Sequence, residues 1–148
     1  MKSEYLLDTC VLSETVKPRP SVAVLEFLLR NEGRMAMPAI VWHELVYGTG
    51  RLAAGRRKER LEAWLRGVVA PHFPVLPYDG EAARLHAGFR AALEAQGRVL
   101  SFADGQIAAI ALVHELVLVT RNLADFADIP GLRVENPFSG VDSTHDSV

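Results

Sequence analysis

The chain has 148 residues, 49% of them apolar and 23% charged, which is typical of one globular domain with a hydrophobic core. Its net charge of −2 does not by itself indicate a nucleic-acid partner, and its single cysteine, Cys10, excludes an internal disulfide framework and favours a reducing cytoplasm. The N-terminus carries no apolar export signal, and the longest apolar stretch, IAAIALVHELVLV, is too short to span a bilayer, so we expect no membrane association.

Short apolar runs alternate along the chain with longer segments of helical spacing, and turn residues separate them. Apolar runs bounded by polar turns are typical of buried strands, whereas apolar residues repeated every three or four positions are typical of helices. In chain order we expect a strand at 4–7, a helix at 22–30, a strand at 34–37, helices at 39–52 and 56–69, a strand at 73–78, helices at 81–97 and from about 101 to 115, and strands at 116–120 and 132–137.

Local signals place the beginnings of the first two of these helices. Ser21 can cap the first one, because a serine hydroxyl accepts a hydrogen bond from the unpaired N–H groups of the first turn. Pro38 can open the second one, where a missing N–H costs nothing. The spacing of the first helix places Val22, Leu25 and Leu29 on one side, which we expect to face the core.

Apolar strands that alternate with helices predict an α/β fold with a mostly parallel central sheet. Ligands of such sheets bind outside the carboxyl ends of the strands, and Asp8 directly follows the first predicted strand. We expect residues 1–138 to form a single domain. Residues 139–148, SGVDSTHDSV, are rich in serine and aspartate and are expected to form a polar, flexible tail.

Two carboxylates in the first third of the chain each allow two interpretations. Asp8 can cap the helix that follows the strand, or it can be a metal ligand, since a hard cation prefers carboxylate oxygen. Glu44 has Ile40, Val41 and Tyr47 as its helical neighbours, so it would project from a largely apolar face unless its tip reaches solvent or an arginine. A zinc-protease HExxH motif is excluded, because the second histidine would stand at Tyr47.

Two further acidic positions lie in the last third of the chain. Ser101 and Asp104 fit a capping box at the start of a helix, and Asn122 with Asp125 repeats that spacing after a strand. Capping and metal binding both place an acid at a helix start, so neither interpretation excludes the other. If these acids gather near Asp8 they repel one another, and a divalent cation is the usual remedy.

Four segments together resemble the PIN-domain ribonucleases, and specifically the VapC toxins of bacterial toxin–antitoxin pairs: LLDTCVLSE, PAIVWHELVYG, FADGQIAAIA, and VTRNLADF followed by NPF. The resemblance runs from about residue 4 to residue 138. It implies a three-layer α/β/α fold in which Asp8, Glu44 and Asp104 bind magnesium or manganese at the end of the sheet. It also implies a fourth polar or acidic group from the segment 120–125.

The chain departs from the family pattern at two positions. Many PIN nucleases carry aspartate where this chain has Asn122, so we take Asp125 as the fourth acidic group. The family often has asparagine or serine where this chain has Cys10, and a thiol is a poor hydrogen-bond donor. We therefore expect Cys10 to be a small packing residue.

The resemblance implies hydrolysis of RNA phosphodiester bonds that leaves a 5′-phosphate and a 3′-hydroxyl. A Mg²⁺ or Mn²⁺ ion would lower the pKa of a water and stabilise charge on the phosphate. Asp8 and Asp104 are the expected direct ligands, and Glu44 is a ligand, a holder of a metal-bound water or a general base. Asp125 joins them as a catalytic residue. The candidates for hydrogen bonds to the carboxylates or the phosphate are Thr9, Thr120, Arg121 and Asn122.

The partners that the resemblance implies are an RNA substrate, a VapB-type antitoxin and a second copy of the chain in a homodimer. Such antitoxins lay an apolar, often arginine-bearing segment across the toxin and reach into the acidic site. A basic cluster follows the Glu44 helix and either contacts phosphates or forms a solvated helix face; it consists of Arg51, Arg56, Arg57, Lys58 and Arg60.

Other interpretations fit the residues less well. A haloacid-dehalogenase-like phosphatase needs Asp-x-Asp, which Cys10 breaks, and a receiver domain needs a late lysine, whereas no lysine follows Lys58. His86 and His114 lie in no metal-ligand spacing and are expected to be ordinary helix residues. The remaining alternative is a catalytically inactive PIN fold that acts as an RNA-binding or protein-interaction module.

Overall fold

The computed structural model describes residues 2–138, so the predicted tail at 139–148 lies outside the described residues. Five short strands form one sheet in which every pairing is parallel, in the order β3-β2-β1-β4-β5. The strands are β1 (Tyr5–Leu7), β2 (Met35–Pro38), β3 (Val75–Leu76), β4 (Val117–Val119) and β5 (Val134–Glu135).

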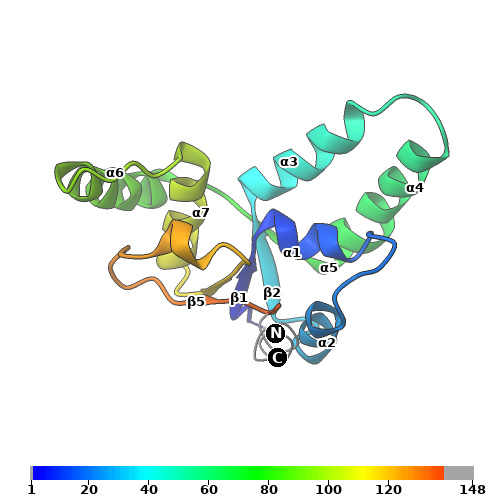
Figure 1. The fold of residues 1–148 in the computed structure, drawn as a ribbon, viewed down its shortest axis with the longest axis horizontal. Helices are drawn as coiled ribbons and strands as arrows, with labels where there is room; N and C mark the ends of the chain where they lie inside the picture. Colours follow the sequence, from blue (N-terminus) through cyan, green and yellow to red (C-terminus); the bar gives the residue numbers. More distant parts are fainter. Residues whose placement is uncertain (1, 139–148) are drawn as a thin grey trace, which may run out of the picture.

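Helices cover both faces of this sheet, which confirms the predicted three-layer α/β/α architecture with a parallel sheet (Figure 1). Helices α6 and α7 lie together on one side, whereas α3 and α4 form an arm on the other (Figure 1). The helical elements are α1 (Thr9–Glu14), α2 (Val22–Arg30), α3 (Ala39–Gly50), α4 (Arg56–Trp64) with the π-helical turn η1 (Leu65–Val69), α5 (Ala70–His72), α6 (Gly80–Ala95), α7 (Phe102–Val113) and the 3-10 turn η2 (Leu123–Phe126).

The central strand β1 sets the register of the sheet and the position of its carboxyl end. Leu6 pairs with Ala36 of β2 on one side and with Leu118 of β4 on the other, and all three are fully buried. Burying a leucine side chain stabilises the fold by about 1.5–3 kcal/mol. Because the strands are parallel, β1 and β4 end at the same edge, and Asp8 and Thr120 follow them there.

Helix α2 has the predicted bounds but turns a different face to the core. Val22 and Leu29, predicted to face inward, are 60% and 74% exposed, whereas Val24 and Phe27 are buried. The ring of Phe27 meets Tyr5 edge-on at a centroid distance of 5.1 Å. That prediction was therefore wrong, because which side of an apolar helix is buried depends on the strand beneath it.

The packing of α6 on α7 depends on one glycine next to Asp104. Gly105 is buried, and a Cβ atom at this position would collide with Nε2 of His86 on α6. His86 is itself 2% exposed, and its Nδ1 lies 2.8 Å from the hydroxyl of Tyr78. The close approach of the two helices holds the first turn of α7, which carries Asp104, against α6.

None of the helices within residues 2–138 combines the length and the apolar character needed to cross a membrane.

Candidate functional site

Asp8 leaves the end of β1 and caps α1, as one of its two predicted interpretations requires. Its backbone is extended (φ −78°, ψ 162°), and its Oδ1 accepts a 2.8 Å hydrogen bond from the N–H of Thr9. The backbone N–H of Asp8 donates to the carbonyl of Val119, which ties the end of β1 to the end of β4. The side chain is 8% exposed, so the carboxylate is fixed by the sheet and by the helix together.

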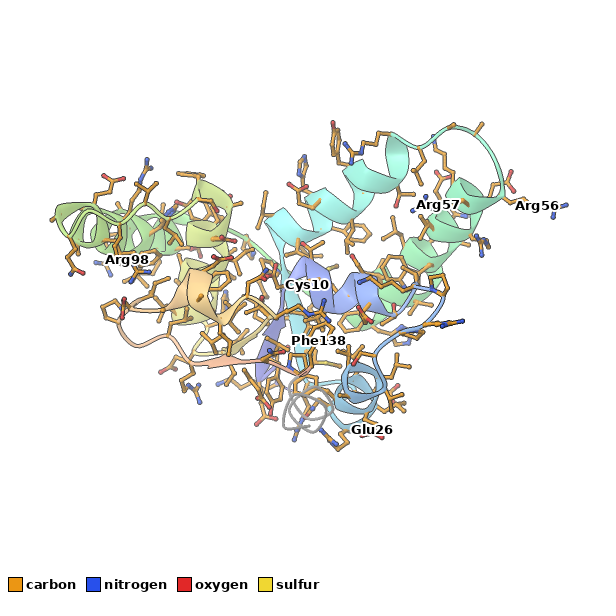
Figure 2. The ribbon with its side chains drawn as sticks, viewed as in Figure 1. Cys10, Glu26, Arg56, Arg57, Arg98 and Phe138 are labelled. Atoms are coloured by element: carbon orange, nitrogen blue, oxygen red, sulfur yellow. The ribbon has the colours of Figure 1, made fainter. Side chains whose placement is uncertain are left out.

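Thr120 completes the support of Asp8 from the end of β4. Its hydroxyl donates a 2.8 Å hydrogen bond to Oδ2 of Asp8 and accepts one from the N–H of Asn122 at 3.1 Å. The side chain is fully buried, so this hydroxyl has no exposed surface through which an RNA could contact it. The thiol of Cys10 lies 3.8 Å from the same hydroxyl and packs against the core, at the place that Figure 2 labels near the start of α1.

Asp104 stands in the first turn of α7, where Ser101 caps the helix by accepting a 3.1 Å hydrogen bond from the N–H of Asp104. Burial raises the pKa of the Asp104 carboxyl above its usual range, and the charges of Asp8 and Asp125 raise it further. A hydrogen bond with Ser101 acts in the opposite direction. The tertiary structure thus brings together three acids that are far apart in the sequence. We call Asp8, Asp104 and Asp125 the acidic site.

The segment after β4 differs from the predicted capping pattern. Asn122 precedes the 3-10 turn η2, but its side chain makes no capping hydrogen bond. Its backbone is engaged instead, since its N–H donates to Thr120 and its carbonyl accepts from the N–H of Asp125 at 3.2 Å. Both side chains are exposed, and Asp125 is the one whose charge acts on Asp104.

Glu44 lies on α3 and is not among the residues that line the small cavity of Asp104 and Asp125. Its side chain is 49% exposed, so its tip reaches solvent, which was one of the two predicted alternatives; its Oε1 lies 3.7 Å from Nδ1 of His43, which is an ion pair only when that histidine is protonated. Together with Thr9 it lines a cavity of about 840 Å³ between α1, α3 and α4, which we call the α3–α4 groove. The lining of the groove also includes Lys17, Leu45, Arg57, Arg60, Leu61 and Trp64.

The carboxylates of the acidic site are chemically suited to a magnesium or manganese ion, which prefers oxygen ligands. A bound cation would also relieve the repulsion that raises the pKa of Asp104. Within residues 2–138, no three His, Cys, Asp or Glu side chains stand close enough to hold one ion together. Since magnesium commonly binds one or two carboxylates and keeps several waters, the residues fit an ion held by Asp8 and Asp104.

The predicted basic residues are divided between several places. The guanidinium of Arg121 lies over the ring of Phe138 at 3.7 Å. Arg51 lies over Tyr47, and Nζ of Lys58 donates to the carbonyl of Gly50. Helix α4 buries none of its residues, and its first arginines project at the opposite end of the molecule from Arg98 (Figure 2). Most of the cluster is therefore a solvated helix face, whereas Arg57 and Arg60 line the α3–α4 groove.

Two features near the acidic site were not predicted. His86, expected to be an ordinary helix residue, is the buried contact of Gly105, and the only sequence signal for it is a glycine inside a predicted helix. Arg98 forms an ion pair with Asp128 and lines a small cavity together with Asp104 and Asp125. No local pattern could have identified this pair, since its members are 30 residues apart.

Known proteins of one family are similar to this chain over most of its length. A family model of the PIN domain matches residues 5–132. The chain is 35% identical to the VapC ribonuclease Y4jK of Sinorhizobium fredii, over 90% of this chain and 96% of that protein. It is 34% identical to the tRNA(fMet)-specific endonuclease VapC of Shigella flexneri, over 90% and 97% of the two chains. A crystal structure of DNA-bound VapBC from Salmonella typhimurium matches with a TM-score of 0.78 and 34% identity, over 91% and 98%.

Proposed function

The chain belongs to the PIN domain family, and from this premise we propose that it is a metal-dependent endoribonuclease that acts as the toxin of a toxin–antitoxin pair. The relatives named above are a ribonuclease and a tRNA endonuclease, and the match extends over nearly the whole length of each. The proposed substrate is RNA, and the proposed reaction is hydrolysis of its phosphodiester bonds to a 5′-phosphate and a 3′-hydroxyl.

The observation that carries this proposal is that Asp8 and Asp125, which follow β1 and β4, lie close enough to Asp104 for their charges to act on its carboxyl. Burial is the main cause of the raised pKa of Asp104, and the charges of Asp8 and Asp125 add to it, although the three residues come from separate elements. Like charges held together by tertiary structure cost stability, and such clusters are typical of functional sites. A fold without catalytic or cation-binding duties gains nothing from this arrangement.

We assign each candidate residue a role within that site. A divalent cation, Mg²⁺ or Mn²⁺, supplies a water of lowered pKa and offsets charge on the phosphate. Asp8 and Asp104 are the proposed ligands, and Asp125 provides the fourth acidic position in place of Asn122. Glu44 is a further ligand, a holder of water or the general base, and it acts from the α3–α4 groove.

The neighbouring polar residues hold the carboxylates or meet the substrate. Thr120 fixes the orientation of Asp8 through its buried hydroxyl, and Thr9 does the same through its backbone N–H. The exposed side chains of Arg121 and Asn122 are the proposed contacts to the RNA backbone.

The proposed partner in regulation is a VapB-type antitoxin, because the matched Salmonella structure is of VapBC. The α3–α4 groove has the lining that an apolar antitoxin segment needs, since Leu45, Leu61 and Trp64 stand beside charged residues. We further propose that residues 1–138 are one nuclease domain, that the toxin is a homodimer and that it acts in the cytoplasm.

The proposal is tested by incubating antitoxin-free protein with total cellular RNA, with magnesium, with manganese and with a chelator. Discrete metal-dependent products are expected from the wild type. Asp8→Ala and Asp104→Ala, each shown to be folded by circular dichroism, should lose at least about 100-fold of the cleavage rate, more than is usual for residues that only support a metal ligand.

Sequencing the 5′ ends of the products would identify the cleaved RNA. Absence of cleavage by the folded wild type, together with no measurable binding of either cation, would reject the enzyme. The PIN-fold RNA-binding or protein-interaction module would then take its place.

A further inference from the structure

A small cavity adjoins the acidic site on the side of α6, and the reaction described above uses only the two carboxylates that the cavity shares with that site. Its volume is about 260 Å³, and Asp104 and Asp125 stand at its border with the acidic site. We call it the Arg98 pocket, and its lining also includes Leu93, Arg98, Leu100 and Ser101. Pockets for whole drug-sized ligands begin at about 300 Å³, so this one has room for a single flat group.

The two walls of the Arg98 pocket come from distant segments that one ion pair joins. Arg98 belongs to the connection between α6 and α7, whereas Asp125 and Asp128 belong to the segment that includes and follows η2. The side chain of Arg98 pairs with Asp128 and is 39% exposed, so the ion pair does not enclose it. Figure 2 shows Arg98 on the α6 side of the molecule, far from the arginines of α4.

The chemistry of this pocket suits an unpaired nucleobase. Leu93 and Leu100 line the pocket beside Arg98, and Arg98 supplies a rigid fork of donors that the edge of a base can meet. A guanidinium binds guanine best among the bases, because guanine presents two acceptors, O6 and N7, side by side. Adenine offers the N7 acceptor next to an amino donor, which faces the guanidinium unfavourably.

We propose that the Arg98 pocket receives one unpaired base of the RNA substrate next to the cleaved bond and that Arg98 selects guanine there. The inference rests on the proposed function, because the phosphate to be cleaved lies at Asp104 and the neighbouring base then lies at the pocket. Asp128 competes with the base for Arg98 and holds the guanidinium at the pocket edge in the free protein.

The test measures equilibrium binding of short unpaired RNA oligonucleotides by fluorescence anisotropy, in chelator so that no cleavage occurs. The oligonucleotides carry a single guanine, or adenine, cytosine or uracil in its place. The variants are Arg98→Ala, Arg98→Lys and Asp128→Asn, and the matched control is Arg84→Ala, which removes an exposed arginine paired with Glu81 near the start of α6. Asparagine tolerates the left-handed backbone of Asp128, whose φ is 68°.

The wild type and Arg84→Ala should bind the guanine oligonucleotide about 10- to 100-fold more tightly than the others. Arg98→Ala should lose that preference, and so should Arg98→Lys, which keeps the charge but not the fork. Asp128→Asn should keep the preference with equal or tighter binding, because it removes the competitor of the base.

The proposal is overturned if the wild type binds all four oligonucleotides equally or binds none of them. It is also overturned if the Arg98 variants keep the preference for guanine, or if Asp128→Asn loses that preference as Arg98→Ala does. The last result would mean that the ion pair only holds the walls together. Cleavage assays with added metal separate the two proposals. Guanine-selective binding without cleavage would reject the proposed nuclease activity and keep the proposed base pocket. Cleavage without base preference would reject the base pocket and keep the nuclease activity.

Discussion

The acidic site and the α3–α4 groove both carry acids expected from the same family motifs, yet these acids differ in how far they are buried and in how many hydrogen bonds hold them. Asp8 is 8% exposed and held by hydrogen bonds from two elements, whereas the side chain of Glu44 is 49% exposed and has only His43 as an ion-pair partner among the described residues. The acidic site is small, negative and tied to the sheet. The groove is lined by basic and apolar side chains in addition to Glu44.

The proposed function assigns the chemistry to the acidic site and the binding of a partner to the α3–α4 groove. A group that acts on reacting atoms must be held in place by its surroundings, and buried hydrogen bonds at the ends of β1 and β4 do this for Asp8. A surface that receives a long partner needs area and adaptable charge instead, and α4, which buries none of its residues, supplies both. We therefore expect substitutions in the two regions to change different measured quantities.

The largest effect in this comparison is expected from Thr120→Val, which keeps the shape of the buried side chain but removes its hydroxyl. Asp8 loses the hydrogen bond to Oδ2 and the N–H of Asn122 loses its acceptor, so the cleavage rate should fall about 100-fold. Single-turnover kinetics measure the rate, and Thr120→Ser, which restores the hydroxyl, is the control. Equal activity of the valine and serine variants would show that Asp8 does not depend on this support.

Glu44→Gln should have a smaller effect, a decrease of about 10-fold in the same assay, because an exposed carboxylate is held less firmly than Asp8. The substitution keeps the size of the side chain and removes only its charge. A decrease of about 1,000-fold or more would place Glu44 at the reacting atoms as the general base and would remove the distinction between the two regions.

Removing Arg57 and Arg60 together should weaken RNA binding without changing the rate at saturating RNA. The slope of log affinity against log salt concentration is negative, and it should become less steep by about 0.7 for every phosphate that the protein no longer neutralises. Binding titrations at several salt concentrations measure this slope, and Arg84→Ala is the control for removal of an exposed charge. An unchanged slope would mean that the groove receives no RNA backbone.

The smallest expected effect is a gain in stability from Asp104→Asn in metal-free protein. The pKa of Asp104 is raised in the folded state by burial and by Asp8 and Asp125, so ionisation of this group opposes folding. The protonated carboxyl of Asp104 stabilises the folded state, and this stabilisation is fully present below the unfolded pKa of the group. It is lost as the pH rises through the raised folded pKa. The melting temperature of Asp104→Asn should exceed that of the wild type at pH 7, and the difference should shrink at about pH 3, below the ordinary aspartate pKa.

A melting temperature of Asp104→Asn at or below that of the wild type at pH 7 would contradict the repulsion between the acids. Addition of magnesium or manganese should reverse the order of the two melting temperatures. The ion stabilises the folded protein according to its affinity, and it should bind the wild type more tightly than Asp104→Asn.

The elements and their ends were largely determined by signals that act within four residues. Ser21 caps α2, Ser101 caps α7 and Asp8 caps α1, each through a hydrogen bond to an N–H group at most three positions away. The order of apolar strands and helices determined the parallel sheet, and parallel strands place Asp8 and Thr120 at one edge. The helix caps depend on neighbouring residues and the sheet depends on the order of the elements, so both can be predicted from the sequence.

The tertiary structure alone decided which groups are buried and which distant groups meet. It turned Phe27 rather than Leu29 to the core, left Glu44 open to solvent, and enclosed the hydroxyl of Thr120. It also joined Arg98 to Asp128 across 30 residues and brought Asp125 to Asp104. Burial and long-range pairing depend on what packs against a residue, and the packing partner is chosen by the whole fold rather than by its neighbours in the chain.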